Sequence, residues 1–413
     1  MVDAGVSYLS AEQSQGETSR TALTNPMTGP ISRRRGVDIG FGAIWIMSDL
    51  SLPVSALARS KTQLSVSAYF DDTLYQHELA TVFAQGPRYV GHALNIPEPG
   101  DYHALAHEGE GRVLVRNPGG PELLSNVCRH RQAVMLRGRG NTRANIVCPL
   151  HRWTYDLQGE LVGAPHFAED PCLALKRYPL REWNGLLFED NGRDIAADLA
   201  RLGPRAALNF EGYQFDRTIV HECNYNWKTF IEVYLEDYHV GPFHPGLGQF
   251  VACEDLAWEF GPHHSVQTVG VHKELARPGS AVYQRWHDEL LRFREGRAPE
   301  HGAIWLTYYP HIMVEWYPHV LVVSTLHPKG PQKTLNVVEF YYPEEIVAFE
   351  RDFVAAHQAA YMETCTEDDE IAERMDQGRR ALMERGDDEA GPYQSPMEDG
   401  MQHFHEWYRR EIG

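Results

Sequence analysis

The chain has 413 residues, 43% of them hydrophobic and 23% charged, which is typical of a soluble globular protein and long enough for two domains. The formal net charge of −19 argues against nucleic acid and anionic membrane surfaces as partners, and no apolar run approaches the roughly 18–20 residues of a membrane helix. Six cysteines are too few for a secreted disulfide scaffold, so we expect a cytoplasmic protein whose clustered Cys and His residues bind metal.

Residues 1–46 are rich in Ser, Thr and Gly and are predicted to form a disordered tail. Within this region Arg33-Arg34-Arg35 precedes the short apolar stretch 41–47, a weak likeness to an export signal. The apolar stretch is brief and has an aspartate on each side, so the tail is the favoured interpretation. Met47 is an alternative natural start, because globular sequence begins just after it.

Residues 71–83 have the spacing of a helix, and residues 47–94 are assigned to the N-terminal part of a larger domain. Between residues 95 and 203 short apolar runs separated by Pro, Gly and Asn predict a β-rich domain. The runs that predict strands in it are 112–115, 144–147 and 185–188, with a turn at 117–121.

Residues 204–413 predict a longer α+β segment. Residues 222–239 have helical spacing that Gly241-Pro242 interrupts. Three β-branched and aromatic runs predict adjoining strands, and residues 343–385 predict one or two long helices. The three runs are 304–309, 312–317 and 320–326.

The β-rich segment carries a first set of metal-binding residues. Cys128-Arg129-His130 is followed, after 17 residues, by Cys148-Pro149-Leu150-His151, so two short loops each offer one sulfur and one nitrogen. A structural zinc uses the same ligand types, but zinc knuckles usually pair Cys with Cys and His with His. A 2Fe–2S cluster explains the mixture better, with two thiolates on one iron and two imidazoles on the other.

Together with Trp153, Tyr155 and Gly159, these loops resemble the Rieske cluster-binding motif. The resemblance implies that Tyr155 donates a hydrogen bond to a cysteine sulfur and tunes the reduction potential. Leu150 and Arg152 stand where the family commonly has Tyr and Gly. Neither residue is a ligand, so the departure concerns the potential or the docking surface and not the cluster.

A second set of metal-binding residues lies near the middle of the chain. His239 and His244 are five residues apart, and a helix break at Gly241-Pro242 is expected to turn His244 back towards His239. Two histidines and one carboxylate form the facial triad of non-haem ferrous oxygenases. The candidate carboxylates are Glu367-Asp368-Asp369 on the predicted C-terminal helix, where acidic residues also occur simply because they favour a helix N-terminus.

The second set resembles the catalytic domain of ring-hydroxylating oxygenases, and the likeness extends to residues 393–407. In that family an acidic pair precedes a Gln-Gly at a fixed distance, and Gln377-Gly378 fits this frame, which implies Asp369 as the third ligand and Asp368 as the alternative. The resemblance also implies that Glu236 connects His239 to the cluster histidine His151 of the partner subunit. Asp237 is the alternative for that role.

The resemblance, over residues 70–410, implies the catalytic alpha subunit of a Rieske non-haem iron oxygenase, a mono- or dioxygenase. The expected fold is α+β, with a β-rich 2Fe–2S domain inserted in a helix-grip-like catalytic domain that has an antiparallel sheet. The expected cofactors are the 2Fe–2S cluster and a mononuclear Fe(II), with NAD(P)H acting through a reductase or ferredoxin. A head-to-tail homotrimer, with or without a small beta subunit, follows from the family.

Two substrate classes remain open: aromatic compounds, some of them carboxylated, and methyl-ammonium or betaine-like compounds that lose a methyl group. Aromatic residues on the predicted strands are candidates for either a cation cage or an apolar slot. These candidates are Trp305, Tyr308, Tyr309, Trp316 and Tyr317. The alternatives to an oxygenase are a Rieske electron-transfer protein with an inactive iron site and a zinc-stabilised binding protein.

Overall fold

The computed structural model describes residues 62–413, apart from residues 273, 274 and 276. The predicted N-terminal tail and the alternative start at Met47 lie outside the described residues. Within the described part of the chain, no helix combines the length and apolar character needed to cross a membrane.

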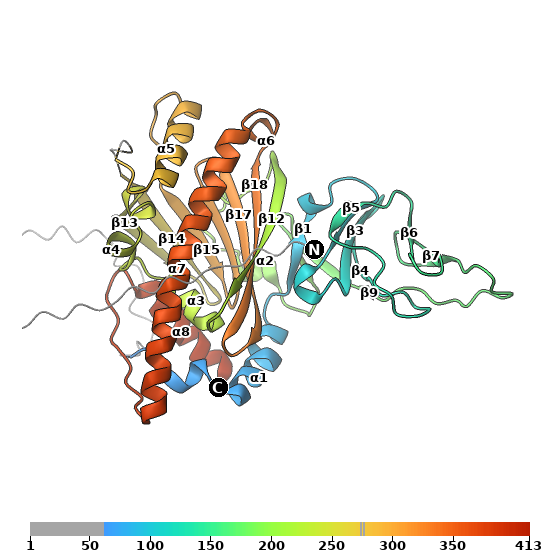
Figure 1. The fold of residues 1–413 in the computed structure, drawn as a ribbon, viewed down its shortest axis with the longest axis horizontal. Coiled ribbons are helices and arrows are strands. Elements are labelled where there is room, and N and C mark those ends of the chain that lie inside the picture. Colours follow the sequence, from blue (N-terminus) through green and yellow to red (C-terminus); the bar gives the residue numbers. More distant parts are fainter. Residues whose placement is uncertain (1–61, 273–274, 276) are drawn as a thin grey trace, which may run out of the picture. The chain divides into compact units, whose positions relative to one another are not determined.

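The β-rich domain contains three small antiparallel sheets (Figure 1). Its five-stranded sheet has the order β5-β2-β3-β4-β9, and two three-stranded sheets have the orders β6-β7-β8 and β1-β11-β10. The strands are β1 (Tyr89–His92), β2 (Asp101–Ala104), β3 (Arg112–Asn117), β4 (Gly120–Ser125), β5 (Arg139–Asn141), β6 (Asn145–Val147), β7 (Thr154–Asp156), β8 (Leu161–Gly163), β9 (Arg177–Tyr178), β10 (Leu180–Trp183) and β11 (Leu186–Glu189). The three predicted strands are therefore present as β3, β6 and β11.

The predicted turn at residues 117–121 joins β3 to β4. Asn117 accepts a hydrogen bond on Oδ1 from the backbone N–H of Gly119, at 2.6 Å. Gly120 has a φ of 136°, a conformation that side chains with a Cβ rarely adopt. The Asn-Pro-Gly-Gly sequence therefore closes the hairpin through local turn chemistry.

The α+β domain is built on one seven-stranded antiparallel sheet with the order β12-β18-β17-β16-β15-β14-β13. Its strands are β12 (Tyr213–Cys223), β13 (Val251–Phe260), β14 (His264–Val271), β15 (Ala303–Tyr308), β16 (Ile312–Tyr317), β17 (Val320–Gly330) and β18 (Lys333–Pro343). The three predicted strand runs are β15, β16 and β17, whereas β18 has no counterpart among the predicted elements. The α+β fold with an antiparallel sheet is confirmed.

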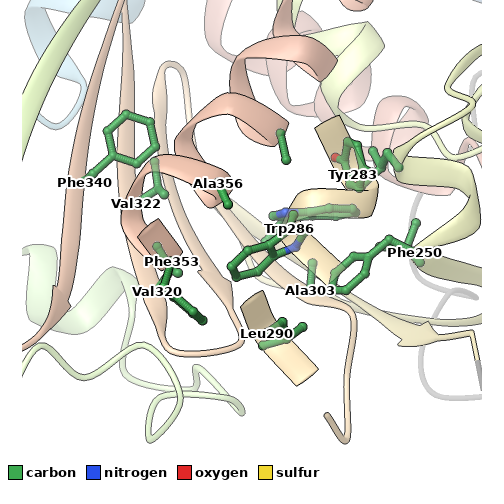
Figure 2. Packing of buried hydrophobic residues seen from close by; sticks show 14 of the residues in the cluster. Phe250, Tyr283, Trp286, Leu290, Ala303, Val320, Val322, Phe340, Phe353 and Ala356 are labelled. Carbon is green, nitrogen blue, oxygen red and sulfur yellow. The ribbon is translucent and has the colours of Figure 1, made fainter. Parts of the chain in front are cut away.

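Alternate residues of the central strands pack into different cores. On β15, Ala303 and Trp305 join a core with helices α5 (Ala281–Phe293) and α7 (Arg351–Arg385), while Ile304 and Tyr308 join the core on the other face. Figure 2 shows the first core, where Trp286 of α5 lies beside Phe353 and Ala356 of α7. This alternation decides which strand residues can reach the cavity under α7.

The long helix α7 crosses the face of this sheet and packs against α5 (Figure 1). The remaining helices are α1 (Asp72–Glu78), α2 (Ile195–Asp198), α3 (Trp227–Tyr234), α4 (Val240–Phe243), α6 (Glu344–Phe349) and α8 (Asp399–Ile412). A third core joins Leu64, Tyr69 and Val82 to Phe404 and Trp407 of α8. Residues that precede the β-rich domain therefore pack with the C-terminal helix.

The predicted helix over residues 222–239 is wrong in its extent. Residues up to Cys223 belong to β12, α3 ends at Tyr234, and Gly241-Pro242 lie inside α4 instead of breaking a helix. The chain leaves helical geometry because the backbone N–H of Asp237 donates to the carbonyl of Met397, a distant segment that the local pattern cannot include. Pro242 is tolerated in α4 because the first turn of a helix needs no internal N–H donor there.

Candidate functional site

The two Cys/His loops have the same backbone conformation. The N–H of Cys128 donates to the carbonyl of Ala133 (2.9 Å), and the N–H of Cys148 donates to that of Trp153 (2.8 Å). Each loop has a left-handed residue four positions after its cysteine, Gln132 at φ 54° and Arg152 at φ 60°. Arg152 therefore occupies a position whose conformation favours glycine, which explains the family's preference there.

The loops bury both cysteine sulfurs, whereas one of the two histidines is exposed. Cys128 and Cys148 are buried free thiols, whereas His151 is exposed and His130 is half-buried against Trp153, with ring centroids 5.0 Å apart. The His130 and His151 rings lie 4.6 Å apart. The structure places the phenol oxygen of Tyr155 3.5 Å from the Cys128 sulfur.

The donor set fits a 2Fe–2S cluster better than one zinc ion. The buried Nδ1 atom of His130 has no hydrogen-bond partner among the described residues, as expected of a metal ligand. The ligand atoms of a single metal ion lie close together. Among the described residues, the ligand atoms of Cys128, His130, Cys148 and His151 do not form a set within 4.8 Å of one another. Burial raises the pKa of Cys148, so a thiolate at this position would need a bound cation to stabilise its charge.

The second set of ligands converges on one point. The Nε2 atoms of His239 and His244 are 3.0 Å apart, and Oδ1 of Asp368 lies 2.9 Å from the second and 3.5 Å from the first. Three ligand atoms that sit about 2.1 Å from one octahedral ion at right angles are about 3 Å apart. The three side chains thus have the spacing of a facial triad.

Two further carboxylates orient the histidines. Glu236 lies 2.5 Å from Nδ1 of His239 and also accepts a hydrogen bond from its backbone N–H, and Glu367 lies 2.7 Å from Nδ1 of His244. Each imidazole therefore donates Nδ1–H to a carboxylate and keeps Nε2 free for a metal ion. Burial lowers the pKa of His239, but Asp368 and Glu236 outweigh it and raise the pKa to about 10, so this surplus of negative charge favours a bound cation.

The structure places Asp369, the ligand implied by the Gln-Gly frame, away from the two histidines. Its carboxylate lies 2.8 Å from Nε2 of His221 and accepts a hydrogen bond from the hydroxyl of Tyr225, also at 2.8 Å. One residue on a helix turns a side chain by about 100°. The register of α7 therefore directs Asp368, the alternative, towards the histidines.

Asp237, the alternative bridging residue, is also directed elsewhere. It is buried, it accepts a hydrogen bond from Gln267, and its Oδ2 atom has no partner among the described residues. Burial raises the pKa of Asp237 to about 7. Glu236, and not Asp237, contacts His239.

A cavity adjoins the triad. Of the predicted pocket aromatics, Trp305 and Tyr317 line it, whereas Tyr308, Tyr309 and Trp316 do not. Tyr308 and Trp316 face the opposite side of the sheet, and Tyr309 packs with α8. One of the lining residues that the sequence analysis missed is Glu315, whose signal in the sequence is a single acid inside an otherwise apolar strand.

Comparisons with known proteins match both halves of the chain to known domain families. The model of the Rieske [2Fe-2S] domain matches residues 87–179, and that of the ring hydroxylating alpha subunit (catalytic domain) matches residues 210–413. The chain is 70% identical over 364 residues to putrescine 2-hydroxylase of Ralstonia nicotianae, covering 88% of this chain and 99% of that protein. The enzyme of the same name from Bordetella bronchiseptica is 62% identical over 382 residues, covering 89% and 88%.

Among solved structures, a quaternary ammonium Rieske monooxygenase in complex with L-carnitine has the same fold. It aligns with a TM-score of 0.67 at 20% identity, covering 86% of this chain and 96% of that one. Both domains, each with its set of ligands, are therefore those of one enzyme class. The chain belongs to the ring-hydroxylating alpha subunits and is a Rieske non-haem iron oxygenase.

Proposed function

We propose that the enzyme hydroxylates a carbon atom of a short aliphatic diamine of the putrescine type. The observation that carries this proposal is the charge of the cavity. Its lining includes the carboxylates of Glu236, Asp237, Glu315 and Asp368, and no lysine or arginine among the described residues. Its one further histidine, His357, has a pKa that burial lowers to about 3 and is therefore neutral. Such a cavity favours a cationic substrate over a carboxylated one.

The relatives support the same class. Two proteins more than 60% identical to this chain are named putrescine 2-hydroxylase. Neither substrate class expected from the sequence, an aromatic compound or a methyl-ammonium compound, corresponds to that name. A hydroxylated diamine retains both nitrogen atoms, whereas a demethylation would release formaldehyde.

The reaction balances as a monooxygenation. One C–H bond of the substrate becomes C–OH, one oxygen atom of O2 enters the product, and the other leaves as water. Two electrons and two protons complete the balance, with the electrons drawn from NAD(P)H through a reductase. The iron supplies dioxygen activation, and the protein supplies binding and orientation.

We assign the iron ligands as His239, His244 and Asp368. Glu236 and Glu367 fix the imidazole orientations by holding Nδ1–H of each ring. The cavity walls, which are mainly aromatic and aliphatic, exclude water around the reacting carbon. In the cluster domain we assign Cys128, His130, Cys148 and His151 as ligands and Tyr155 as the residue that tunes the potential.

We further propose that electrons pass between subunits of a head-to-tail trimer. The loops around His151 carry exposed Leu150 and Phe167, at 58% and 49% exposure, among exposed arginines. Two residues after Glu236 in the sequence, the side chain of Tyr238 is 60% exposed. Apolar groups ringed by basic side chains fit an acidic surface with an exposed aromatic, so His151 of the partner subunit would meet Glu236.

The test is a substrate panel assayed with the holoenzyme, a reductase and NADH. Oxygen uptake and product mass would be measured with putrescine, cadaverine, butylamine, L-carnitine, γ-butyrobetaine and benzoate. We expect uptake coupled to a product 16 mass units heavier with the diamines. Formaldehyde from a methyl-ammonium compound, or coupled hydroxylation of benzoate alone, would refute the proposal.

A further inference from the structure

Glu315 is a buried carboxylate held by two phenols. It lies on β16 with 1% of its surface exposed. The hydroxyl of Tyr317 donates to one carboxylate oxygen at 2.8 Å, and the hydroxyl of Tyr361 on α7 donates to the other at 2.9 Å. Trp305, on the neighbouring strand β15, is paired with Glu315 and donates a hydrogen bond from Nε1 to the hydroxyl of Tyr317. Both carboxylate oxygens are thus fixed, and each keeps acceptor capacity for one more donor.

This carboxylate has no cationic partner among the residues that the structure describes. Every ion pair found there involves other acids. Glu232, a carboxylate equally buried on α3, is by contrast paired with both Arg379 and His405. An unpaired buried carboxylate is costly, and burial accordingly raises the pKa of Glu315 to about 7. A cation that enters the cavity would remove that cost.

The surroundings of Glu315 suit a nitrogen that carries hydrogen atoms. The aromatic rings of Tyr234, Trp305, Tyr317 and Tyr361 line the same cavity. The hydroxyl of Tyr234 is buried and has no hydrogen-bond partner among the described residues, so it is free to accept one. A primary ammonium offers three N–H donors, whereas a trimethylammonium offers none and gains only from the ring faces.

Glu315 lines the same cavity as the proposed iron ligands. Tyr361, Thr364, Cys365 and Asp368 line the cavity from one face of α7. Tyr361, which contacts Glu315, is seven residues before Asp368, so the two lie about 10 Å apart along the helix. Because Glu315 and the triad line the same cavity, a substrate whose ammonium binds Glu315 can place another part of its alkyl chain towards the triad.

We propose that Glu315 binds the primary ammonium of the substrate farther from the reacting carbon and so sets both the charge and the length of the amines accepted. This inference rests on the proposed function and adds to it the residue that selects the substrate. Tyr317 and Tyr361 hold the carboxylate in place, and Tyr234 accepts a further N–H. The site thereby prefers a primary ammonium to a quaternary one.

The chain contains a matched control for the test. Glu339 on β18 is buried to 2% exposure and is likewise held by two phenols, those of Tyr89 (2.5 Å) and Tyr341 (3.2 Å). It packs on the opposite face of the sheet and does not line the cavity beside the triad. Neutralising Glu339 therefore reproduces the structural change at Glu315 without touching the proposed substrate position.

The experiment compares wild type, Glu315→Gln and Glu339→Gln as cluster-loaded holoenzymes. Anaerobic calorimetry measures putrescine binding, and steady-state assays give KM and kcat for putrescine, butylamine and γ-butyrobetaine. For Glu315→Gln we expect Kd and KM for putrescine to rise about 10- to 100-fold, as for loss of a hydrogen bond to a charged group. The affinity for butylamine, whose single ammonium would bind at Glu315, should fall by a similar factor in Glu315→Gln. Glu339→Gln should bind putrescine like wild type.

Each outcome decides between the two proposals. If wild type hydroxylates putrescine and Glu315→Gln keeps its Kd and KM, the role of Glu315 is refuted and the proposed function stands. If Glu339→Gln weakens binding equally, the effect is structural and the inference is also refuted. If wild type binds no diamine at all, the proposed function fails and the inference fails with it. The visible spectrum of the cluster and the melting temperature show that each variant is folded.

Discussion

The two metal-binding regions of this chain differ in how they are assembled and in their access to solvent. The Cys/His loops are held by hydrogen bonds within each loop and bring one histidine, His151, to the surface. The second set is assembled from α4 and α7, which are more than 100 residues apart in the chain, and it opens on an internal cavity. A centre that exchanges electrons with another protein must lie near the surface, whereas a centre that transforms a substrate needs an enclosed pocket.

The charges around the two regions are also opposite. Arg129, Arg131 and Arg152 are exposed beside the cluster loops. Glu236, Glu367 and Asp368 surround the two histidines of the second region. The contrast shows that the two regions differ in charge although the chain as a whole has a net charge of −19. Acidic side chains surround the place where a metal ion and a cationic substrate would bind, and the basic loops can dock on such a surface.

The largest effect should come from Asp368. Asp368→Asn removes a charged ligand, and we expect loss of mononuclear iron and of turnover to background, with the cluster spectrum unchanged. Asp369→Asn is the matched control on the next residue, and it should keep its iron and most of its activity. Iron and sulfide analysis measures both variants, and the reverse pattern would restore Asp369 as the ligand.

Glu236 tests whether the two regions communicate. Glu236→Gln keeps the shape but weakens the hold on His239, and we expect turnover to fall about 100-fold. Iron content should change far less than turnover. Asp237→Asn, which contacts Gln267 and not His239, should have a small effect on electron transfer. Single-turnover oxidation of the reduced cluster, followed in the visible spectrum with substrate and O2 present, measures the step directly.

Mixing inactive subunits sharpens the same comparison. A subunit without a cluster, such as His151→Ala, and a subunit without mononuclear iron, Asp368→Asn, should regain activity when co-expressed. In a head-to-tail ring the intact cluster site of one variant subunit lies next to the intact mononuclear iron site of the other variant. If the co-expressed mixture stays inactive while each parent assembles, electrons do not cross between subunits.

Glu367 should have a smaller effect, because it contacts a ligand and not the metal. Glu367→Gln weakens the hold on Nδ1 of His244, and we expect iron affinity to fall about 10-fold. Competition with an iron chelator measures the change. Glu370→Gln changes an exposed acid of the same helix whose ion-pair partner within residues 62–413 is Arg374, and this control should bind iron like wild type.

A pH dependence follows from Glu315, whose pKa burial raises to about 7. The titratable groups facing it are Tyr317 from its own strand, Tyr361, Cys365 and Asp368 from α7 and Tyr234 from α3. Below that pKa the carboxyl group is protonated and cannot attract an ammonium, so kcat/KM for the diamine should fall about fivefold from pH 7 to pH 6. In Glu315→Gln this step should be absent.

The smallest effect is expected at the cluster. Tyr155 is 3.5 Å from the Cys128 sulfur, and Tyr155→Phe removes this weak donor. We expect the reduction potential to fall by roughly 40 mV, equivalent to a hydrogen bond of about 1 kcal/mol, with little loss of substrate affinity. Protein-film voltammetry measures the shift, and an unchanged potential would contradict the role.

The comparison also explains what the sequence could predict. The candidate cluster ligands lie within two short loops, so a local sequence motif is enough to predict them. Type and spacing alone make His239 and His244 candidate ligands, although the helix break invoked for them is not present. Asp368 and Asp369 differ only by the rotation of α7, which depends on packing against α5 and the sheet. Glu315 was missed because its role appears only when Tyr361, from another element, lies beside it.

The most direct test of the account is EPR of anaerobic enzyme with the cluster oxidised and nitric oxide added as a probe of mononuclear Fe(II). An S = 3/2 signal in wild type and Asp369→Asn, perturbed by putrescine and absent in Asp368→Asn, is the expected result. A signal that persists in Asp368→Asn, or that putrescine leaves unchanged at saturating concentration, would contradict an iron held by Asp368 beside an amine-binding cavity.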